Sequence, residues 1–463
     1  MTYAFTFDAS ACSGCKACQE ACKDKNNLPT GILWRRVVEV NGGEWRQAGK
    51  AWENSVFAYN LSLACNHCTH PKCAGVCPTD AFSVRPDGIV LLDTSKCMGC
   101  GYCNWACPYG APQYDRTHGV MTKCNFCYDN LDAGIPPTCV AACPLRVLEY
   151  GSVEELADVK KQTNLWQLPG AEHPYPLPKY SRTEPHLAIR PHPAMSNQQA
   201  RLVGNREEIL PPGSIESNQR IAAGHELPLV AFTLLTQMAA GMAVGGLVHY
   251  PLPLLALLTI GLVLGAGGVT SFLHLGRKRN AWRAVTHLRK SWLSREVLMA
   301  GLFGIAWAAT SGWQWVEKGN PTYWPMAIVA SGLVYTMSRV YRLRAVPGWN
   351  TWHTQATFIL SAITLGVTAI SFFTPLSGWV LITGMALAIE LGLGLETRSE
   401  MYSRPGALRL IMLGMGILVA ILISMAPQLD GVWMKALIFT LILIEEVIGR
   451  WQFYIRRSPF PSN

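Results

Sequence analysis

The pattern of hydrophobic and polar positions changes near residue 225 of this chain of 463 residues. Before that point, apolar and polar residues alternate in short stretches at residues 3–8, 56–63 and 88–92. Because a strand with one buried face has a side-chain period of two, each stretch predicts a short β-strand. Beyond residue 225 the chain consists of long apolar runs. We therefore expect two structurally different parts, a mixed α+β region followed by an all-α region.

The apolar runs of the second part have the length of membrane helices, which need about twenty apolar residues to cross a bilayer. Eight such segments lie at residues 228–249, 252–275, 296–316, 322–342, 354–374, 376–396, 408–426 and 432–455. Prolines, glycines or basic loops separate them. The pattern predicts an eight-helix transmembrane bundle over residues 226–463. An even number of spans returns the C-terminus to the side of the N-terminus.

A proline-rich segment, residues 151–225, connects the two parts. Proline lacks a backbone donor and has a fixed φ, so we expect little helix or sheet here. We interpret the segment as an extended strap, with a disordered tail as the alternative. Four apolar residues favour a strap docked on the protein, namely Leu187, Ile189, Leu202 and Ile209.

The sixteen cysteines all fall in the first part, residues 1–150, in four groups of four. The first and third groups have the spacing C-x2-C-x2-C-x3-C of bacterial ferredoxins. Pro78, Pro108 and Pro144 follow the last cysteine of three groups, as in that motif. Structural zinc usually binds paired CxxC motifs, and chance disulfide pairs would not keep this register. The spacing therefore favours [4Fe–4S] clusters over both alternatives.

In the ferredoxin motif the fourth cysteine of each group binds the neighbouring cluster, and this exchange predicts four ligand sets. The first and fourth groups give Cys12, Cys15, Cys18 and Cys143 for one cluster, and Cys124, Cys127, Cys139 and Cys22 for its neighbour. The second and third groups give Cys65, Cys68, Cys73 and Cys107, and then Cys97, Cys100, Cys103 and Cys77. We expect a two-lobe ferredoxin-like domain in which four clusters form a path for electrons.

An insertion at residues 26–54 separates the first two cysteine groups and contains Trp34, Trp45 and Trp52. We expect these aromatic side chains to pack over a cluster. An interface with another subunit is the alternative.

The formal net charge of +9 indicates a membrane protein rather than a nucleic-acid-binding protein, because many basic residues flank the apolar runs. Loops on the side of the N-terminus carry most of them, including Arg277, Lys278, Arg279, Arg342, Arg344, Arg398 and Arg409, whereas the other side has Lys318 and Lys435. Positive loops mark the cytoplasmic face. The N-terminus also has no signal-peptide or twin-arginine pattern. We expect an inner-membrane protein whose cluster domain is cytoplasmic.

Both parts resemble the dimethyl sulfoxide reductase family. CSGCKACQEACKD, LSLACNHCTHPKCAGVCP and CMGCGYCNWACPYGAPQYD resemble its electron-transfer subunit, and HELPLVAFTLLTQ, SFLHLG and EEVIGRWQFY resemble its membrane anchor. The resemblance implies a fusion of two subunits that are usually separate polypeptides. It also implies a separate catalytic partner carrying a molybdopterin cofactor (Mo-bisMGD) and exchange of electrons with membrane quinone. Relatives act on different substrates, including sulfite and polysulfide, so the substrate does not follow.

His274 and Glu296 are the candidate quinone-binding residues. His274 ends the second predicted span and Glu296 opens the third, so one loop places both at the same membrane face. Ionisable side chains in spans are costly and usually functional, and this pair can exchange the protons of a quinone. The resemblance also associates both positions with quinol binding. The alternative is that His274 only caps a helix end and Glu296 is only an interfacial charge. Second-rank candidates for the quinone site are Arg339, Glu390, Glu445 and Glu446. Of these, Glu446 is expected to pair with Arg450 four residues later.

We expect no haem, because His249 lies at the membrane end opposite His225, His274, His287 and His353. Two other functions are weighed. One is a membrane-anchored iron–sulfur scaffold without quinone chemistry. The other is a subunit of an ion-pumping complex, which would need charged residues at mid-span on several helices, and few are expected here.

Overall fold

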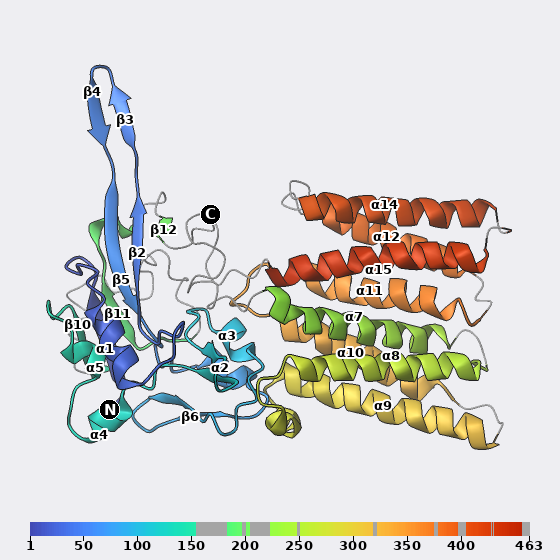
Figure 1. Cartoon of the computed structure of the whole chain (residues 1–463), viewed down its shortest axis with the longest axis horizontal. Coiled ribbons are helices and arrows are strands. Elements are labelled where there is room, and N and C mark those ends of the chain that lie inside the picture. Colours follow the sequence, from blue (N-terminus) through green and yellow to red (C-terminus); the bar gives the residue numbers. More distant parts are fainter. Residues whose placement is uncertain are drawn as a thin grey trace. The chain divides into compact units, whose positions relative to one another are not determined.

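The computed structural model describes residues 1–153, 183–196, 201–203, 223–247, 251–317, 322–374, 378–396, 404–426, 428 and 430–455 (Figure 1). The chain divides into two compact units, one within Met1–Ile221 and one within Ala222–Arg457. The first contains all the described strands and short helices beside the cysteines, and the second contains long helices.

One sheet of the first unit is built around β1 (Tyr3–Asp8), which pairs antiparallel with β10 (Leu148–Ser152) and parallel with β11 (Leu187–Arg190). The predicted strand is confirmed as β1, in which Phe5 and Phe7 are each 2% exposed, although Ala4 between Tyr3 and Phe5 is also buried. The ring of Phe5 stacks on Phe126 with 4.0 Å between centroids. This sheet therefore contacts the fourth cysteine loop.

A second sheet has the order β12-β2-β5, with β2 at Arg36–Gly42, β5 at Phe57–Leu63 and β12 at Arg201–Val203. Beyond this sheet the chain continues as a hairpin of β3 (Trp45–Ala48) and β4 (Ala51–Asn54), which projects from the unit (Figure 1). Gly43 has φ +82°, and a Cβ there would lie 2.1 Å from the Ser55 carbonyl oxygen, so only glycine fits where the hairpin begins.

The expected packing of the insertion's tryptophans over a cluster is wrong for two of the three. Trp45 and Trp52 are 60% and 61% exposed on the β3–β4 hairpin, where every residue faces solvent. Trp34 packs against the core, and its Nε1 donates to Thr122 Oγ1 at 3.1 Å. A two-stranded ribbon has no layer over its faces, so its side chains stay in water.

Short elements flank each cysteine group. The helices are α1 (Ala17–Lys25), α2 (Lys72–Val76), α3 (Tyr102–Ala106), α4 (Tyr128–Asp132) and α5 (Thr138–Ala141). Two small hairpins accompany them, β6–β7 (Phe82–Val84 with Val90–Leu92) and β8–β9 (Gln113–Asp115 with Val120–Thr122). The strands predicted at residues 56–63 and 88–92 are confirmed as β5 and β7.

Much of the predicted strap, residues 154–182, 197–200 and 204–222, lies outside the described residues, and so does Ile209. In the described part the expectation of little sheet is wrong, because β11 and β12 each join a sheet, and a 3-10 turn covers Pro193–Ser196. Leu187 and Ile189 are 3% and 1% exposed. Their burial confirms docking for this stretch of the strap.

The described part of the second unit contains eight long helices, and each predicted apolar segment falls on one of them. They are α7 (Ala223–Gly245), α8 (Leu254–Leu273), α9 (Trp292–Glu317), α10 (Trp324–Tyr341), α11 (Trp352–Ile370), α12 (Trp379–Glu396), α14 (Arg404–Met425) and α15 (Val432–Ile455). The α8–α9 loop forms a 3-10 helix at Lys278–Val285. Helix α9 begins before the predicted span, so Glu296 lies inside its first turns rather than at its start.

Close helix packing depends on glycine. At the α7–α11 contact, a Cβ on Gly241 would lie 1.8 Å from the Ala362 carbonyl oxygen, and Gly366 meets Gly241 in the same way. Four helical segments are long and apolar enough to cross a membrane, at Leu227–Gly245, Leu254–Leu273, Trp352–Ile370 and Pro405–Met425. The others in the described residues are shorter or more polar. This unit therefore has the character of an integral-membrane helical domain.

Candidate metal centres and buried membrane site

The first cysteine loop shows how the local backbone gathers sulfurs. Cys12 and Cys15 lie between β1 and α1, and Gly14 between them has φ +73°. A Cβ on Gly14 would lie 2.5 Å from Asn60 Oδ1, so the turn requires glycine. Cys18 and Cys22 follow one helical turn apart in α1 and are both buried. The third loop repeats this plan, with Gly99 and Gly101 at φ 73° and 75°.

The four predicted cysteine sets are each brought together in the structure, as judged by electrostatic interactions between their thiols. They are numbered here as four sites. Site 1 has Cys12, Cys15, Cys18 and Cys143; site 2 has Cys124, Cys127, Cys139 and Cys22; site 3 has Cys65, Cys68, Cys73 and Cys107; site 4 has Cys97, Cys100, Cys103 and Cys77.

The sites are also arranged in series. Cys18 of site 1 is in electrostatic range of Cys139 of site 2. Cys124 of site 2 interacts with Cys65 of site 3. Cys103 of site 4 interacts with Cys73 of site 3. Each site thus has a near neighbour, in the order 1, 2, 3, 4.

At sites 1 and 3 the cysteines line a small pocket. The pocket at site 3 is lined by its four cysteines together with Lys123, Pro108 and Thr183. The pocket at site 1 is lined by its four cysteines, Lys16 and Pro144. Four sulfurs around such a space suit a cubane cluster.

Backbone amides point at several of the sulfurs. The amide of Gly99 donates to Cys97 Sγ at 3.4 Å, and that of Phe126 to Cys124 Sγ at 3.3 Å. The amide of Ala81 donates to Cys77 Sγ at 3.4 Å. Hydrogen bonds to cluster sulfurs stabilise the reduced, more negative state and so tune the potential.

Burial raises the pKa of several of these thiols and makes them poor acids without a metal. Burial, with Cys139 nearby, raises the pKa of the Cys22 thiol to about 12. Burial raises the pKa of Cys107 to about 11. A metal-bound sulfur is deprotonated outright, so a bound cluster would remove this cost. The donor set therefore fits a thiolate-ligated metal.

Two buried cations near these sites were not anticipated from the sequence. Arg35 is 2% exposed and interacts with cysteines of sites 1 and 2, while its Nε and Nη2 have no hydrogen-bond partner in the described residues. Its Nη1 donates to Ser62 Oγ at 3.1 Å. Lys123 is 3% exposed, beside site 3, and its Nζ donates to the carbonyls of Val90 and Cys124. The only sequence signal was that each basic residue adjoins an apolar stretch.

In the helical unit, His274 is the C-cap of α8 and Glu296 lies in α9. His274 Nδ1 and Glu296 Oε1 are buried and have no hydrogen-bond partner in the described structure. Glu296 is 2% exposed. Among the residues that the structure describes, no hydrogen bond or ion pair joins His274 to Glu296. Each has an unused polar atom for a ligand.

Aromatic and basic residues surround this region. Two guanidiniums make cation–π contacts with the Trp292 ring. That of Arg295 lies 4.2 Å from the ring centroid, and that of Arg339 lies 4.8 Å from it. Tyr341 is in electrostatic range of Glu296, and its hydroxyl accepts from Tyr454 at 2.7 Å.

The histidines weighed for haem fall at different places in the chain. His249 and the side chain of His225 lie outside the described residues. His287 lies in a turn, and His353 lies in the first turn of α11. The expectation of no haem stays a prediction.

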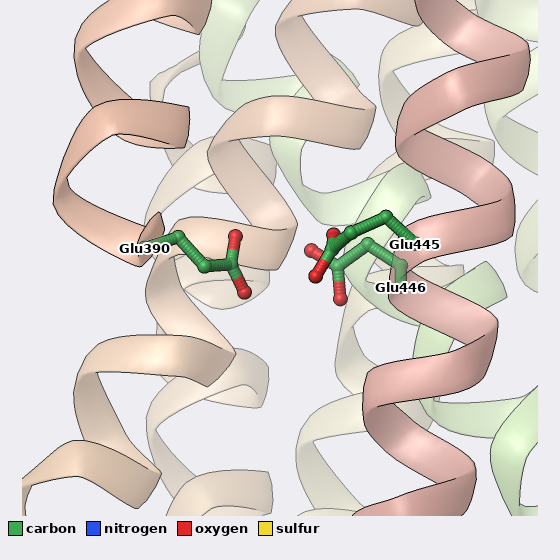
Figure 2. Close-up of side chains that lie close together, drawn as sticks. All are labelled: Glu390, Glu445 and Glu446. Carbon is green, nitrogen blue, oxygen red and sulfur yellow. The ribbon is translucent and has the colours of Figure 1, made fainter. Parts of the chain in front are cut away.

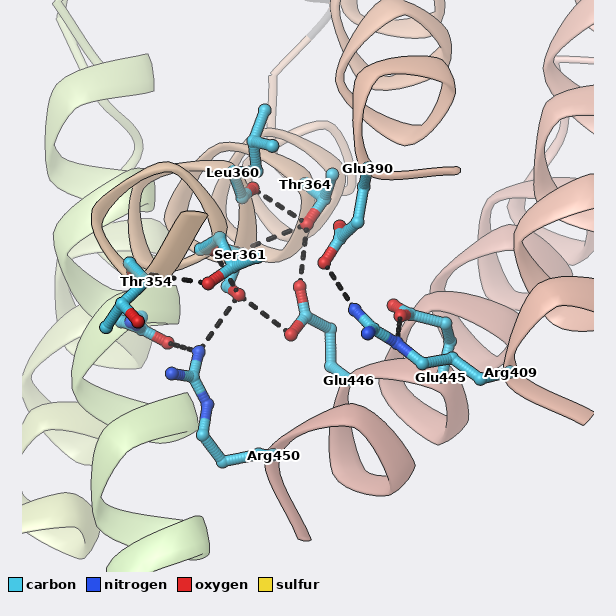
Figure 3. A network of polar contacts seen from close by, with 11 residues as sticks. Thr354, Leu360, Ser361, Thr364, Glu390, Arg409, Glu445, Glu446 and Arg450 are labelled. Carbon is cyan, nitrogen blue, oxygen red and sulfur yellow. Dashed lines mark hydrogen bonds and ion pairs between the residues drawn. The ribbon is translucent and has the colours of Figure 1, made fainter. Parts of the chain in front are cut away.

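The second-rank acidic residues lie in a buried network instead. Arg409 on α14 bonds Glu390 of α12 and Glu445 of α15, so it is not a loop charge as expected. Glu446 and Arg450 are bridged by Ser361 rather than paired directly (Figure 3). The expectation of few mid-span charges stays a prediction. The sequence could name these five charged residues but not show that they meet, because they come from three helices.

Comparison with known proteins gives two family matches. Residues 56–153 match the 4Fe-4S dicluster domain, and residues 222–382 match the DMSO reductase anchor subunit (DmsC). The protein is 46% identical over 190 residues to the B subunit of anaerobic dimethyl sulfoxide reductase of Escherichia coli (strain K12), covering 41% of this chain and 89% of that protein. It is 42% identical over 210 residues to the corresponding B subunit of Haemophilus influenzae, covering 45% and 96%. It is 40% identical over 154 residues to the thiosulfate reductase electron transfer subunit PhsB of Salmonella typhi, covering 33% and 77%.

Proposed function

Because this chain belongs to the family of dimethyl sulfoxide reductase iron–sulfur subunits and carries an anchor domain of the same enzymes, we propose that it links a membrane quinone to a separate catalytic subunit. It is an electron-transfer iron–sulfur subunit fused to its anchor. The observation that carries the proposal is the series of four cysteine sites in one unit, next in sequence to a helical unit with unpartnered buried polar atoms.

Sites 1 to 4 each hold one [4Fe–4S] cluster in this proposal. The support is the meeting of four sulfurs in each set, with prolines after the fourth cysteine and backbone amides on the sulfurs. A bound cluster accepts and donates single electrons. Arg35 and Lys123 then offset the negative charge of thiolate-ligated clusters in a buried environment.

Quinone binds at His274 and Glu296 in this proposal. Oxidation of a quinol releases two electrons and two protons, so its site needs groups that hydrogen-bond the ring oxygens and accept protons. A buried imidazole nitrogen and a buried carboxylate oxygen without partners in the described residues supply both functions. Trp292, which contacts the guanidiniums of Arg295 and Arg339, precedes Glu296 by one turn of α9.

The catalytic partner carries a molybdopterin cofactor (Mo-bisMGD) and the substrate chemistry. The family membership of the chain supports this partner. The relatives include subunits of dimethyl sulfoxide reductase and of thiosulfate reductase, so the family does not single out one substrate. The β3–β4 hairpin is the proposed docking element for this partner. Large aromatic side chains are common anchors of interfaces, and two stand exposed on this ribbon.

The protein lies in the cytoplasmic membrane with its cluster domain on the cytoplasmic side. Basic loops support this orientation, since Arg277, Lys278, Arg279 and Arg283 follow α8 in a single loop. Arg409 is no longer counted as a loop residue, but the loops on the side of the N-terminus still carry more basic residues than those on the other side. All eight long helices span the bilayer in this arrangement.

The test is reduction of the clusters by a quinol analogue in membranes or mild detergent. His274→Ala and Glu296→Gln should slow this reduction at least tenfold while the iron content stays unchanged. The matched control Glu317→Gln, at the opposite end of α9, should retain normal rates. Normal rates in both site variants would place the quinone elsewhere and remove this assignment.

A further inference from the structure

Three glutamates and two arginines form a buried cluster between α12, α14 and α15. Glu390, Glu445 and Glu446 are 1%, 0% and 3% exposed. One carboxylate oxygen of each lies within 4.8 Å of one from the others, and the three side chains point toward one another (Figure 2). Arg409 and Arg450 are 9% and 5% exposed.

The two arginines bind different partners: Arg409 contacts carboxylates directly, whereas Arg450 contacts an amide and a hydroxyl. Arg409 Nη2 bonds Glu390 Oε1 at 2.9 Å, and its Nε bonds Glu445 Oε1 at 2.6 Å. Arg450 Nη2 donates to Gln237 Oε1 at 2.9 Å and to Ser361 Oγ at 3.0 Å, while Ser361 reaches Glu446 Oε2 at 2.8 Å (Figure 3). Arg409 is thus shared by two carboxyl groups, and Glu446 is held mainly by hydroxyls.

Two oxygens of this cluster have no partner. Glu390 Oε2 and Glu445 Oε2 are buried without a hydrogen bond in the described structure. An ionised carboxylate oxygen left unpaired in a low-dielectric interior is expensive. A proton on one of these carboxyl groups removes a charge and supplies the missing donor.

The charge count leads to the same result. Three ionised carboxylates and two guanidiniums give −3 + 2 = −1. The neighbouring helices add no described charge, because α7 contributes Gln237, and the one ionisable residue of α11 is His353 in its first turn, more than two turns from Ser361. On α15 the next cation, Lys435, bonds the Ser371 carbonyl at 2.8 Å, ten residues before Glu445. Among the described side chains, one unit of negative charge is therefore uncompensated.

We propose that this cluster is an intramembrane proton-binding site, in which one exchangeable proton is shared by Glu390 and Glu445. A proton fits better than a metal cation, because Arg409 already occupies the space between these two carboxyl groups and would repel a second cation. The site is independent of the proposed quinone chemistry.

In our proposal a row of hydroxyls, each of which also donates to a nearby backbone carbonyl, supplies the route for the proton. Helix α11 and its C-terminal end place Thr354, Thr357, Ser361, Thr364, Thr368 and Ser371 at alternating intervals of three and four residues, so they share one face. Thr364 Oγ1 lies 3.4 Å from Glu446, and Thr368 Oγ1 lies 3.4 Å from Thr383 Oγ1. The row ends beside Lys435, which pairs with the exposed Asp430 at 3.7 Å. Exchange with water occurs at this end in our proposal.

Infrared spectroscopy of the full chain tests the site. The protein in nanodiscs should show the carbonyl band of a protonated carboxylic acid that shifts on deuteration. Glu296→Gln serves as the background, because it removes the one buried carboxyl group outside the cluster among the described side chains of this unit. In that background Glu390→Gln or Glu445→Gln should abolish the band. A band that survives both substitutions, or that disappears on adding sodium, would overturn the proposal.

Folding of the variants is itself decisive, because glutamine imitates a protonated carboxyl group. At least one of Glu390→Gln and Glu445→Gln should assemble with near-normal thermal stability, whereas the double variant should lose much more. Failure of both single variants to assemble would mean that both carboxylates are ionised, against the proposal. For the route, Thr368→Val should slow deuteration of the band several-fold relative to the buried control Thr233→Val. Equal rates would remove the route.

Discussion

Cys124 of site 2 and Cys65 of site 3 lie close enough for their thiols to interact, although the two residues belong to different predicted lobes. This contact joins the outer pair of sites to the inner pair. Without it the chain would hold two separate two-cluster units. With it, the four sites form one continuous series, along which a single electron would pass if each site holds a cluster as proposed.

The first prediction concerns metal content. We expect roughly sixteen iron atoms per chain, four for each cubane. Because neighbouring sites are close, EPR spectra of the reduced protein should show interacting spins rather than isolated signals. Metal analysis and EPR of the purified protein check this. A content near eight irons, or zinc in their place, would contradict the assignment of four clusters.

The second prediction concerns site 4. Cys100→Ser removes one of its ligands and should convert that cluster to a three-iron form, because the remaining sulfurs of site 4 still hold three corners. EPR of the oxidised variant should show the new signal, and iron should fall by about one per chain. As a control, Ser95→Ala, which changes an exposed serine, should leave the EPR spectrum unchanged. A full set of cubanes in Cys100→Ser would show that the ligand assignment is wrong.

The third prediction concerns Arg35. Replacing it with Met keeps much of its volume but removes a buried positive charge beside sites 1 and 2. The more negative reduced clusters then lose stabilisation, so their potentials should fall by several tens of millivolts, where about 59 mV is a tenfold change for one electron. Redox titration followed by EPR measures this. Arg46→Met, on the exposed hairpin, is the control and should cause no shift.

The fourth prediction concerns the β3–β4 hairpin. Trp45→Ala and Trp52→Ala should each weaken binding of the catalytic partner by roughly tenfold, about 1.4 kcal/mol, with cluster content preserved. Affinity purification of the complex at several salt concentrations measures this loss. Val84→Ala changes another exposed apolar residue of the same unit and should have no effect. Undiminished binding by the double tryptophan variant would exclude the hairpin as the docking element.

The fifth prediction concerns orientation. Protease added to sealed, right-side-out spheroplasts should leave the N-terminal unit intact, because positive loops keep its side of the membrane cytoplasmic. Inverted vesicles should expose the same unit to cleavage. Immunoblotting with antibodies against residues 1–150 reads out both preparations. Cleavage in spheroplasts and protection in inverted vesicles would reverse the assigned orientation.

The sequence by itself determined the features that depend on short-range spacing. The cysteine intervals predicted that three sulfurs of each group lie together, because a tight loop and one turn of helix fix their reach. The fourth sulfur of each site, such as Cys143 beside Cys12, comes from a distant group and was predicted from the ferredoxin motif instead. Alternation predicted β1, β5 and β7, and apolar runs predicted the positions of the long helices. Each of these is a local property of the backbone, so the residues that specify it are neighbours in the chain.

Only the tertiary structure decided which distant side chains meet. Trp45 and Trp34 come from one insertion, yet one is exposed on a ribbon and the other is packed in the core. Arg409 appeared to flank a span, but helix packing brings it between Glu390 and Glu445. The physical reason is that a charge within an apolar helix must find its partner on another helix. Which helices meet depends on close approaches such as Gly241 with Gly366, which no local pattern encodes.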